Sequence, residues 1–133
     1  MAFGSFDFLH KGHLFYFQES KKLGDKLIVV VARDKTIEKV KGKKPQFTEK
    51  ERLKAVSEVR SVDMAVLGDE IDQFKVLEEF NPDVISLGYD QKSFITDKLD
   101  EEILKRGLKI KVVRVKPFEE QRFKSSKMKN NNL

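Results

Sequence analysis

The run KLIVVVA at residues 26–32 is the feature that most restricts how this chain can fold. After Lys26 its side chains are apolar and mostly β-branched, without polar alternation, which is typical of a strand buried on both faces of a parallel sheet. A second run of this kind, DVISL, occupies residues 83–87. Because parallel neighbours need long crossover connections, usually helices, the two runs predict an α/β chain.

Helical patterns separate the predicted strands along the whole chain. The expected strands span residues 1–4, 26–32, 63–67, 83–87 and 109–115. The expected helices span residues 13–23, 34–40, 48–59, 71–80 and 97–106, and a short helix begins near residue 125. Thr48 and Glu51 form the capping-box pattern of a helix start, and Gly24 and Gly107 mark helix ends. This order predicts one domain over residues 1–133, with a Rossmann-like, doubly wound parallel sheet of about five strands and flanking helices.

Three polar segments follow predicted strands, at residues 4–13, 32–44 and 88–91. Ligands of doubly wound sheets bind beyond the carboxyl ends of the strands, where the strand order reverses. We therefore expect the three segments to converge on one crevice.

The composition excludes several classes of protein. A chain of 133 residues has the size of one compact domain. It contains no cysteine, which rules out a disulfide framework and a thiolate nucleophile or metal site. No apolar run approaches the roughly 18 residues of a membrane span, and the first residues do not resemble a secretory signal. A cytoplasmic location is the simplest expectation.

The net charge of +5 and the pI near 9.3 are compatible with an anionic partner and also with an ordinary basic surface. Nucleic acid, a membrane surface and small polyanions all fit such a balance. Two basic clusters stand out, KVKGKK at residues 39–44 and RFKSSKMK at residues 122–129. The chain has neither an arginine-rich tract nor the alternation of aromatic and basic residues that stacks single strands. We therefore expect neither nucleic acid nor a membrane as a partner, and salt-dependent nucleic-acid binding would support the alternative.

Both histidines of the chain lie in GSFDFLHKGH, residues 4–13. His10 and His13 are three residues apart, a spacing that permits a metal site on a helix. Such a site needs a third ligand, which Asp7 or Asp90 could supply. The alternative without any function is that both side chains simply cap the helix or face solvent.

The position of this segment favours a phosphate site over a metal site. His10 and His13 open a helix directly after a strand, where free N–H groups and the helix dipole attract anions. Gly12 allows the backbone to approach a phosphate closely, and Gly4 permits a tight turn out of the strand. Two imidazoles at such a place can donate hydrogen bonds to phosphate oxygens whose charge grows during a reaction.

GSFDFLHKGH resembles the G-T-F-D-x-x-H-x-G-H signature of the nucleotidylyltransferase superfamily, with Ser5 at the position of the usual threonine. Five further segments follow in the order of its cytidylyltransferase-like branch: LGDKLIVVVARD, KGKK with the later E-x-x-R, RSVDMAVLGD, NPDVISLGYDQ and FKSSKM. Within that branch the chain is most similar to the archaeal FAD synthases, and next to the glycerol 3-phosphate cytidylyltransferases. The latter carry an R-T-x-G lead-in where this chain reads EEQRF, which counts against the cytidylyl alternative.

The resemblance implies that a substrate phosphate attacks the α-phosphorus of a nucleoside triphosphate and releases pyrophosphate. The expected reaction joins ATP and FMN into FAD, and the alternative uses CTP with glycerol 3-phosphate or a similar phosphorylated alcohol. A nucleotide-binding or regulatory module on the same fold is a third possibility. Mg²⁺ or another divalent cation would enter bound to the triphosphate, without protein ligands. Relatives are commonly homodimers, so we expect a homodimer.

The resemblance also implies three groups of site residues. The catalytic group contains His10, His13, Lys41, Lys43 and Ser126. The nucleotide-binding group contains Ser5, Phe6, His10, Lys11, Gly12, His13, Asp90, Phe118, Ser125 and Ser126. The group that binds the acceptor phosphate contains Ser5, Arg52 and Arg60. Structural alternatives remain: KGKK can be a solvated loop, the arginines can form ion pairs on a helix, and Asp90 can stabilise a turn.

Overall fold

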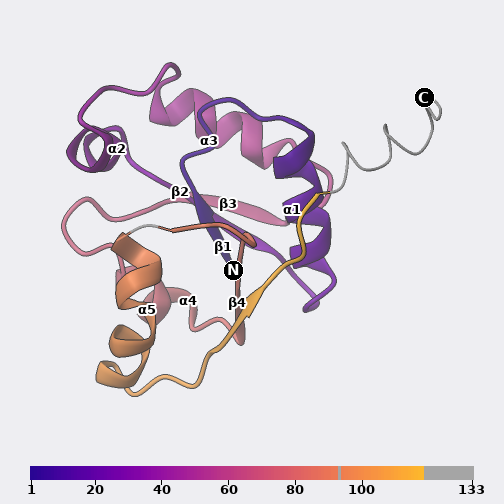
Figure 1. Cartoon of the computed structure of the whole chain (residues 1–133), viewed down its shortest axis with the longest axis vertical. Helices are drawn as coiled ribbons and strands as arrows, with labels where there is room; N and C mark the ends of the chain where they lie inside the picture. Colours follow the sequence, from indigo (N-terminus) through magenta and orange to yellow (C-terminus); the bar gives the residue numbers. More distant parts are fainter. Residues whose placement is uncertain (93, 119–133) are drawn as a thin grey trace.

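Five parallel strands form one sheet in the order β3-β2-β1-β4-β5 (Figure 1). They are β1 (Ala2–Gly4), β2 (Ile28–Val31), β3 (Met64–Leu67), β4 (Val84–Leu87) and β5 (Lys111–Arg114). The computed structural model describes residues 1–92 and 94–118. The strand order reverses between β1 and β4, where a single residue pair, Ala2 with Ser86, marks the register. The doubly wound, five-stranded parallel sheet predicted from the sequence is confirmed.

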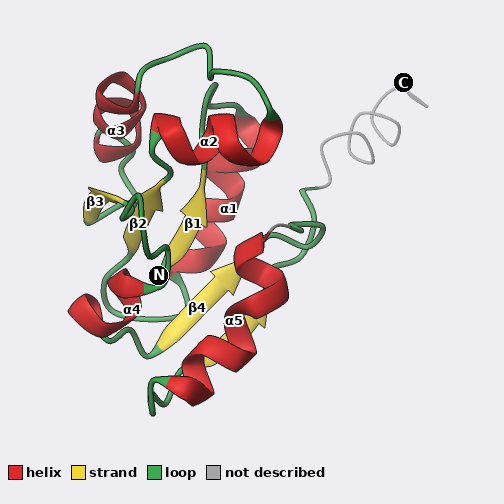
Figure 2. Ribbon diagram, turned by 90° about the vertical axis from the view of Figure 1, so that its left-hand side faces the viewer, coloured by secondary structure: helices red, strands yellow, loops and turns green. Residues whose placement is uncertain are grey.

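Helices cover both faces of the sheet. They are α1 (Lys11–Lys21), α2 (Asp34–Lys41), α3 (Glu49–Ser57), α4 (Lys75–Phe80) and α5 (Phe94–Lys105). α1 and α3 pack on one face, and α4 and α5 pack on the other. α2 lies beyond the arrowheads of the central strands (Figure 2). In the part of the chain that the structure describes, no helix is long and apolar enough to span a membrane.

The side chains of β2 explain why its sequence is apolar throughout. Val29 and Val31 face α1 and α3, where they join the cluster that contains Phe17. Val30 points to the opposite face and packs in the cluster that contains Leu77 of α4. Successive strand residues point to opposite faces, so a strand covered on both sides needs an apolar residue at every position. Full burial of such a side chain contributes about 1.5–3 kcal/mol.

The predicted helices within the described residues are present, but several of their ends differ from the prediction, among them the start of α5, which is Phe94 instead of residue 97. α1 begins at Lys11 instead of residue 13, and its C-cap is Lys22 instead of Gly24. α4 begins at Lys75 instead of residue 71, because a turn held by the Asp69 carboxylate comes first. The capping box at Thr48 is confirmed. The predicted tail helix near residue 125 lies outside the described residues.

Candidate active site

A cavity of about 320 Å³ opens at the carboxyl-terminal edge of the sheet. Its wall contains Phe3, Gly4, Ser5, Val30, Ala32, Arg33, Thr36, Ile37, Val40, Lys41, Gly68, Asp69, Gln73, Gln91 and Lys92. Part of each predicted segment lines this cavity, so the expected convergence is confirmed in part. His10, Gly12, His13 and Asp90 are not in its wall. The segment after β3, which contributes Asp69 and Gln73, was not among the candidates from the sequence.

The turn that follows β1 is built around Phe6. Its side chain is 5% exposed and its φ of 52° lies in the left-handed region, which is unusual for a bulky residue. The Phe6 ring fills the space over Gly4, where an added Cβ would lie 2.6 Å from Cζ. It packs against Phe17 and edge-on against His13, with centroid distances of 5.0 and 5.4 Å. The Phe6 ring therefore supports His13 from the core, and its predicted contact with the nucleotide stays a prediction.

His10 and His13 lie side by side at the start of α1, with ring centroids 3.9 Å apart and ring planes 26° from parallel. Nδ1 of His10 accepts the backbone N–H of Gly12 at 3.0 Å, and Nδ1 of His13 accepts the backbone N–H of His10 at 3.3 Å. Together they form a capping box made of imidazoles. A neutral imidazole that accepts at Nδ1 carries its proton at Nε2, so each ring retains an Nε2–H donor.

The pKa of His13 is lowered from its ordinary value of 6.5 to about 4. The main cause is burial of the half-buried ring, and the second is the charge of His10 beside it. A hydrogen bond with the Phe8 backbone raises the pKa, but by less. His13 is therefore neutral at pH 7 and offers a hydrogen-bond donor without a positive charge.

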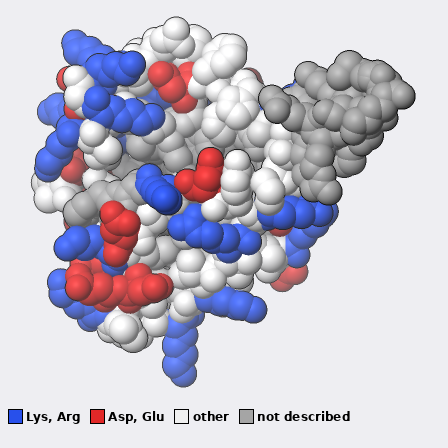
Figure 3. All heavy atoms as spheres, viewed as in Figure 1, with Lys and Arg blue, Asp and Glu red and all other residues white. Residues whose placement is uncertain are grey.

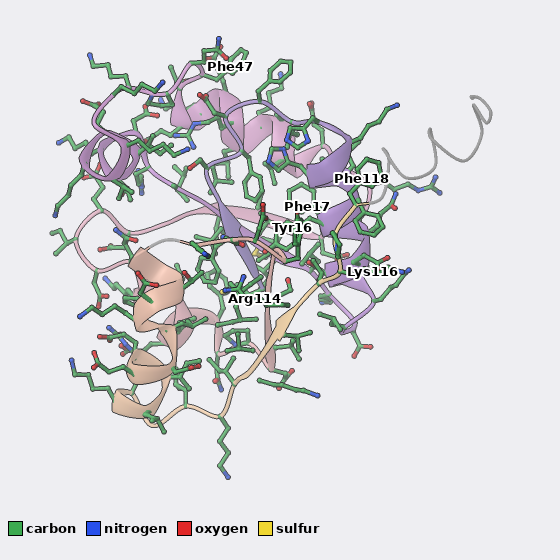
Figure 4. The ribbon with its side chains drawn as sticks, viewed as in Figure 1. Tyr16, Phe17, Phe47, Arg114, Lys116 and Phe118 are labelled. Carbon is green, nitrogen blue, oxygen red and sulfur yellow. The ribbon has the colours of Figure 1, made fainter. Side chains whose placement is uncertain are left out.

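α1 is fixed to β4 by buried polar contacts. The Tyr16 hydroxyl donates to the carbonyl of Ser86 at 2.6 Å, and the Ser86 hydroxyl donates to that of Ser20 at 2.7 Å. Burial raises the pKa of Tyr16 to about 12. Tyr16 and Phe17 point from α1 toward the sheet (Figure 4). The helix that carries both histidines is thus held against the strand beside the reversal in strand order.

The basic loop after α2 is attached to the turn after β1. The Asp7 carboxylate accepts the backbone N–H groups of Gln46 and Phe47 at 2.7 and 2.8 Å. These bonds, that of Gln46 first, lower the pKa of Asp7. Lys41, the last residue of α2, lines the cavity, whereas Lys43 is exposed in the loop and is not part of the cavity wall.

Exposed lysines gather on α2 and the loop that follows it. They are Lys35, Lys39, Lys41, Lys43 and Lys44. Figure 3 shows basic side chains concentrated over this part of the molecule. A one-signed patch beside a crevice raises the local concentration of an anionic ligand.

Arg52 is a buried link between three segments of the chain and not a free cation. Arg52 is 1% exposed. Nε donates to the carbonyl of Phe47, and Nη1 donates to those of Ser5 and Ala32 at 2.8 and 2.7 Å. Nη2 donates to the Asp34 carboxylate at 2.7 Å. The predicted contact with the acceptor phosphate is therefore corrected: four of the five N–H groups of Arg52 are taken by the protein.

Arg60 lies apart from the other predicted site residues. It is exposed in the turn between α3 and β3. A helix-to-strand turn of a parallel sheet lies at the amino-terminal edge, opposite the edge where the cavity opens. The structure therefore corrects the prediction for Arg60 as well, because it does not bring this side chain to the crevice.

The loop after β4 is braced by two residues that sequence reasoning missed. The Gln91 side chain donates to the carbonyl of Phe3 at 3.1 Å and accepts the backbone N–H of Gly88 at 3.0 Å. Nη1 of Arg114 donates to the carbonyls of Gly88 and Gln91 at 2.7 and 2.9 Å. Asp90 is exposed between these braced positions and is not part of the cavity wall.

Phe118 lies against α1 and is not part of the cavity wall. Its ring packs on Phe15 at a centroid distance of 5.4 Å, and Nζ of Lys116 lies 3.9 Å from Glu19 of the same helix. Phe118 and Lys116 both lie along α1 in Figure 4. Of the remaining predicted residues, Lys11 is exposed in the first turn of α1, and Ser125 and Ser126 lie outside the described residues.

Within residues 1–92 and 94–118, no three His, Asp or Glu side chains are grouped so that they could hold a metal ion. This finding concerns metal ligands that the protein itself would supply. The neighbouring lysines and N–H donors suit phosphate oxygens, which can carry a divalent cation into a site themselves.

Comparison with known proteins agrees with this geometry. The family model described as cytidylyltransferase-like matches residues 1–131. The FAD synthase of Archaeoglobus profundus is 49% identical over 126 residues, which are 95% of this chain and 79% of that protein. The FAD synthase of Thermoplasma volcanium is 49% identical over 129 residues, 97% of this chain and 89% of that protein.

A solved structure is also similar. The crystal structure of a lipopolysaccharide core biosynthesis protein from Thermoplasma volcanium GSS1 aligns with a TM-score of 0.81 and 51% identity. The alignment covers 89% of this chain and 95% of that one. Family model, relatives and fold agree, and the chain belongs to the cytidylyltransferase-like family of nucleotidyltransferases.

Proposed function

We propose that the chain transfers the adenylyl group of ATP to the phosphate of FMN, which forms FAD and releases pyrophosphate. The observation that carries this proposal is the position of the cavity. Its wall includes Ser5, in the turn that leads from β1 to the histidines at the start of α1. An apolar cavity beside a phosphate cradle suits an acceptor that has a flat ring at one end and a phosphate at the other. The relatives named FAD synthase support the same reaction.

In this reaction an oxygen of the FMN phosphate attacks the α-phosphorus of ATP. A new P–O bond forms while the bond between the α-phosphorus and the oxygen that bridges the α- and β-phosphates breaks, and pyrophosphate leaves with that oxygen and the electron pair. No protein nucleophile takes part, so the chain acts by positioning and by stabilising charge. The Nε2–H groups of His10 and His13 donate to the phosphate oxygens as their charge grows. Lys41 and Lys43 neutralise the triphosphate from the basic loop.

The acceptor lies with its phosphate near Ser5, whose hydroxyl donates to it. Its isoalloxazine ring lies on the apolar wall, which includes Val30, Ile37 and Val40. Glycerol 3-phosphate has no apolar part to cover this wall, so the cavity favours FMN over the small acceptor of the CTP-dependent alternative.

The other parts of the site remain predictions. Asp90 contacts the nucleoside, and Lys11, Gly12, Phe118, Ser125 and Ser126 contact the nucleotide or its phosphates. A divalent cation such as Mg²⁺ enters on the triphosphate, held by its oxygens. The homodimer and the cytoplasmic location also remain predictions.

A pyrophosphate-release assay tests the reaction. ATP and CTP are crossed with FMN and glycerol 3-phosphate in the presence of Mg²⁺, and the flavin product is identified by mass. Release with ATP and FMN alone is the expected result. Release with CTP and glycerol 3-phosphate would move the chain to the cytidylyl reaction, and release in none of the four mixtures would contradict both.

A further inference from the structure

The Gln73 side chain is a polar group in the cavity wall whose hydrogen-bonding capacity is unused. It lies just before α4, is half-buried, and lines the cavity. Among the described residues its amide takes part in no hydrogen bond. A half-buried amide that has both a free donor and a free acceptor can bind a ligand that presents an acceptor and a donor side by side.

The other hydrogen-bonding side chains of the wall are committed or unsuited to that pairing. Arg33 donates to the carbonyl of Gly68 and to the Glu49 carboxylate. The Gln91 amide is engaged with its own loop and β1, as described above. Thr36 has a single hydroxyl, and lysines only donate. Gln73 alone among the lining side chains offers an uncommitted donor and acceptor side by side.

The segment that carries Gln73 is held in place on both sides. The Asp69 carboxylate accepts the backbone N–H groups of Ile71 and Asp72 at 3.0 and 2.7 Å. The Asp72 carboxylate accepts from Nη2 of Arg106 at 3.0 and 3.1 Å and from the backbone of Phe74. Bonds on both flanks limit the freedom of the backbone at Gln73, which is what a residue that selects a ligand needs.

The segment that carries Gln73 enters the cavity wall from the other side of β2 than Ser5. Gln73 follows β3, and Ser5 follows β1; β2 lies between them. At a strand spacing of about 4.8 Å, the two strand ends are roughly 10 Å apart. Ser5 and Gln73 line the same cavity, so a flavin whose phosphate is held at Ser5 can bring its ring within reach of Gln73.

We propose that Gln73 selects the flavin by forming hydrogen bonds with the pyrimidine edge of the isoalloxazine ring, an inference that rests on the proposed function. That edge presents N3–H between two carbonyl groups. The side-chain carbonyl of Gln73 accepts from N3–H, and its NH₂ group donates to one adjacent ring carbonyl. Such a pair rejects phosphorylated acceptors that lack this edge, because the amide would then be buried without partners.

The test combines a variant with an altered substrate. In Gln73→Leu the amide is lost, and in N3-methyl-FMN the ring donor is lost. The wild-type protein is expected to show a KM about tenfold higher for N3-methyl-FMN than for FMN, as loss of a buried pair predicts. Gln73→Leu is expected to have a raised KM for FMN and to treat both flavins alike, with kcat and the KM for ATP nearly unchanged. Flavin binding without ATP, followed by fluorescence, gives a readout independent of turnover.

Gln18→Leu is the matched control, since it makes the same chemical change at an exposed position of α1. It should keep the wild-type preference for FMN. If Gln73→Leu, folded by circular dichroism, still discriminates against N3-methyl-FMN as the wild type does, the role of Gln73 is refuted while the reaction stands. If the wild type forms no FAD from ATP and FMN, the proposed function fails first.

Discussion

The imidazole rings of His10 and His13 are stacked at 3.9 Å, and the Nδ1 atom of each accepts a backbone N–H from the first turn of α1. The backbone therefore sets the orientation and the tautomer of both rings. The Nε2–H group of His10 is thus a donor oriented before any ligand arrives, and that of His13, which bonds to the Phe8 backbone, is oriented as well. Oriented donors are the condition for effective stabilisation of a transition state.

Two substitutions at His13 separate the donor from the ring. Gln places its side-chain N–H near the position of Nε2, whereas Asn places it near Nδ1. We expect His13→Asn to lower kcat by a factor on the order of 100, as loss of one oxyanion donor does, and His13→Gln to retain more of the activity. The check is kcat in the pyrophosphate-release assay, with thermal unfolding as the control for folding. Equal kcat in both variants and the wild type would exclude His13 from the chemistry.

The pH dependence of stability follows from the lowered pKa of His13, about 4 in the folded chain against an ordinary 6.5. Between these values the unfolded chain binds the proton and the folded chain does not. Stability is therefore highest above pH 6.5 and falls as the pH drops toward 4. Urea unfolding of the wild type and of His13→Asn across this range should show a difference that shrinks toward acid pH. A His13 proton that titrates near 6.5 by NMR would contradict this.

The ring of His10 leaves no room for a side chain at position 12. An added Cβ would lie 2.9 Å from Cε1 and 3.1 Å from Nδ1 of that ring, so Gly12→Ala must displace the imidazole. Displacement of about 1 Å at a reacting centre costs up to about 100-fold in rate. We expect kcat to fall by 10- to 100-fold, on the same principle, with no loss of thermal stability. Gly24→Ala, which meets nothing within 4 Å, is the control and should leave kcat unchanged.

Arg52 and Arg60 allow the same substitution to be compared at a buried and at an exposed arginine. Arg52→Met leaves three backbone carbonyls and Asp34 without their donor, so we expect a loss of about 3–5 kcal/mol in the free energy of unfolding. Arg60→Met, at an exposed turn, should change it by no more than about 0.5 kcal/mol. Urea unfolding measures both. If Arg52→Met kept its stability and instead raised the KM for FMN, the original phosphate prediction would be restored.

The fold was largely predictable because its signals are local. The apolar run of β2 is a consequence of burial on both faces, and Thr48 with Glu51 forms the capping box that the pattern predicts. The start of α1 was not predictable in this way. Its N-cap is His10, and histidine is not one of the residue types that mark a helix start in a sequence. The start of α4 was missed because Asp69 turns the chain before the helix can begin.

The candidate site was predictable only in part, because motif positions do not reveal burial. Arg52 resembles a phosphate ligand in sequence, but its guanidinium is bonded to three backbone carbonyls and the Asp34 carboxylate, which meet only in the folded chain. Gln73 carries no sequence signal at all. It becomes a candidate once the segment after β3 is seen to line the same cavity as Ser5.

The bond between Asp7 and the basic loop yields a final prediction. Asp7→Ala removes the acceptor of the Gln46 and Phe47 N–H groups, and a hydrogen bond to a charged group contributes about 1.5–3 kcal/mol. We expect these two amides to exchange at least about tenfold faster in hydrogen–deuterium exchange, on the same principle, and the KM for ATP to rise because the loop that carries Lys43 is released. Asp25→Ala removes the same charge from an exposed position and serves as the control. Unchanged exchange at Gln46 and Phe47 would show that the loop is held by other contacts.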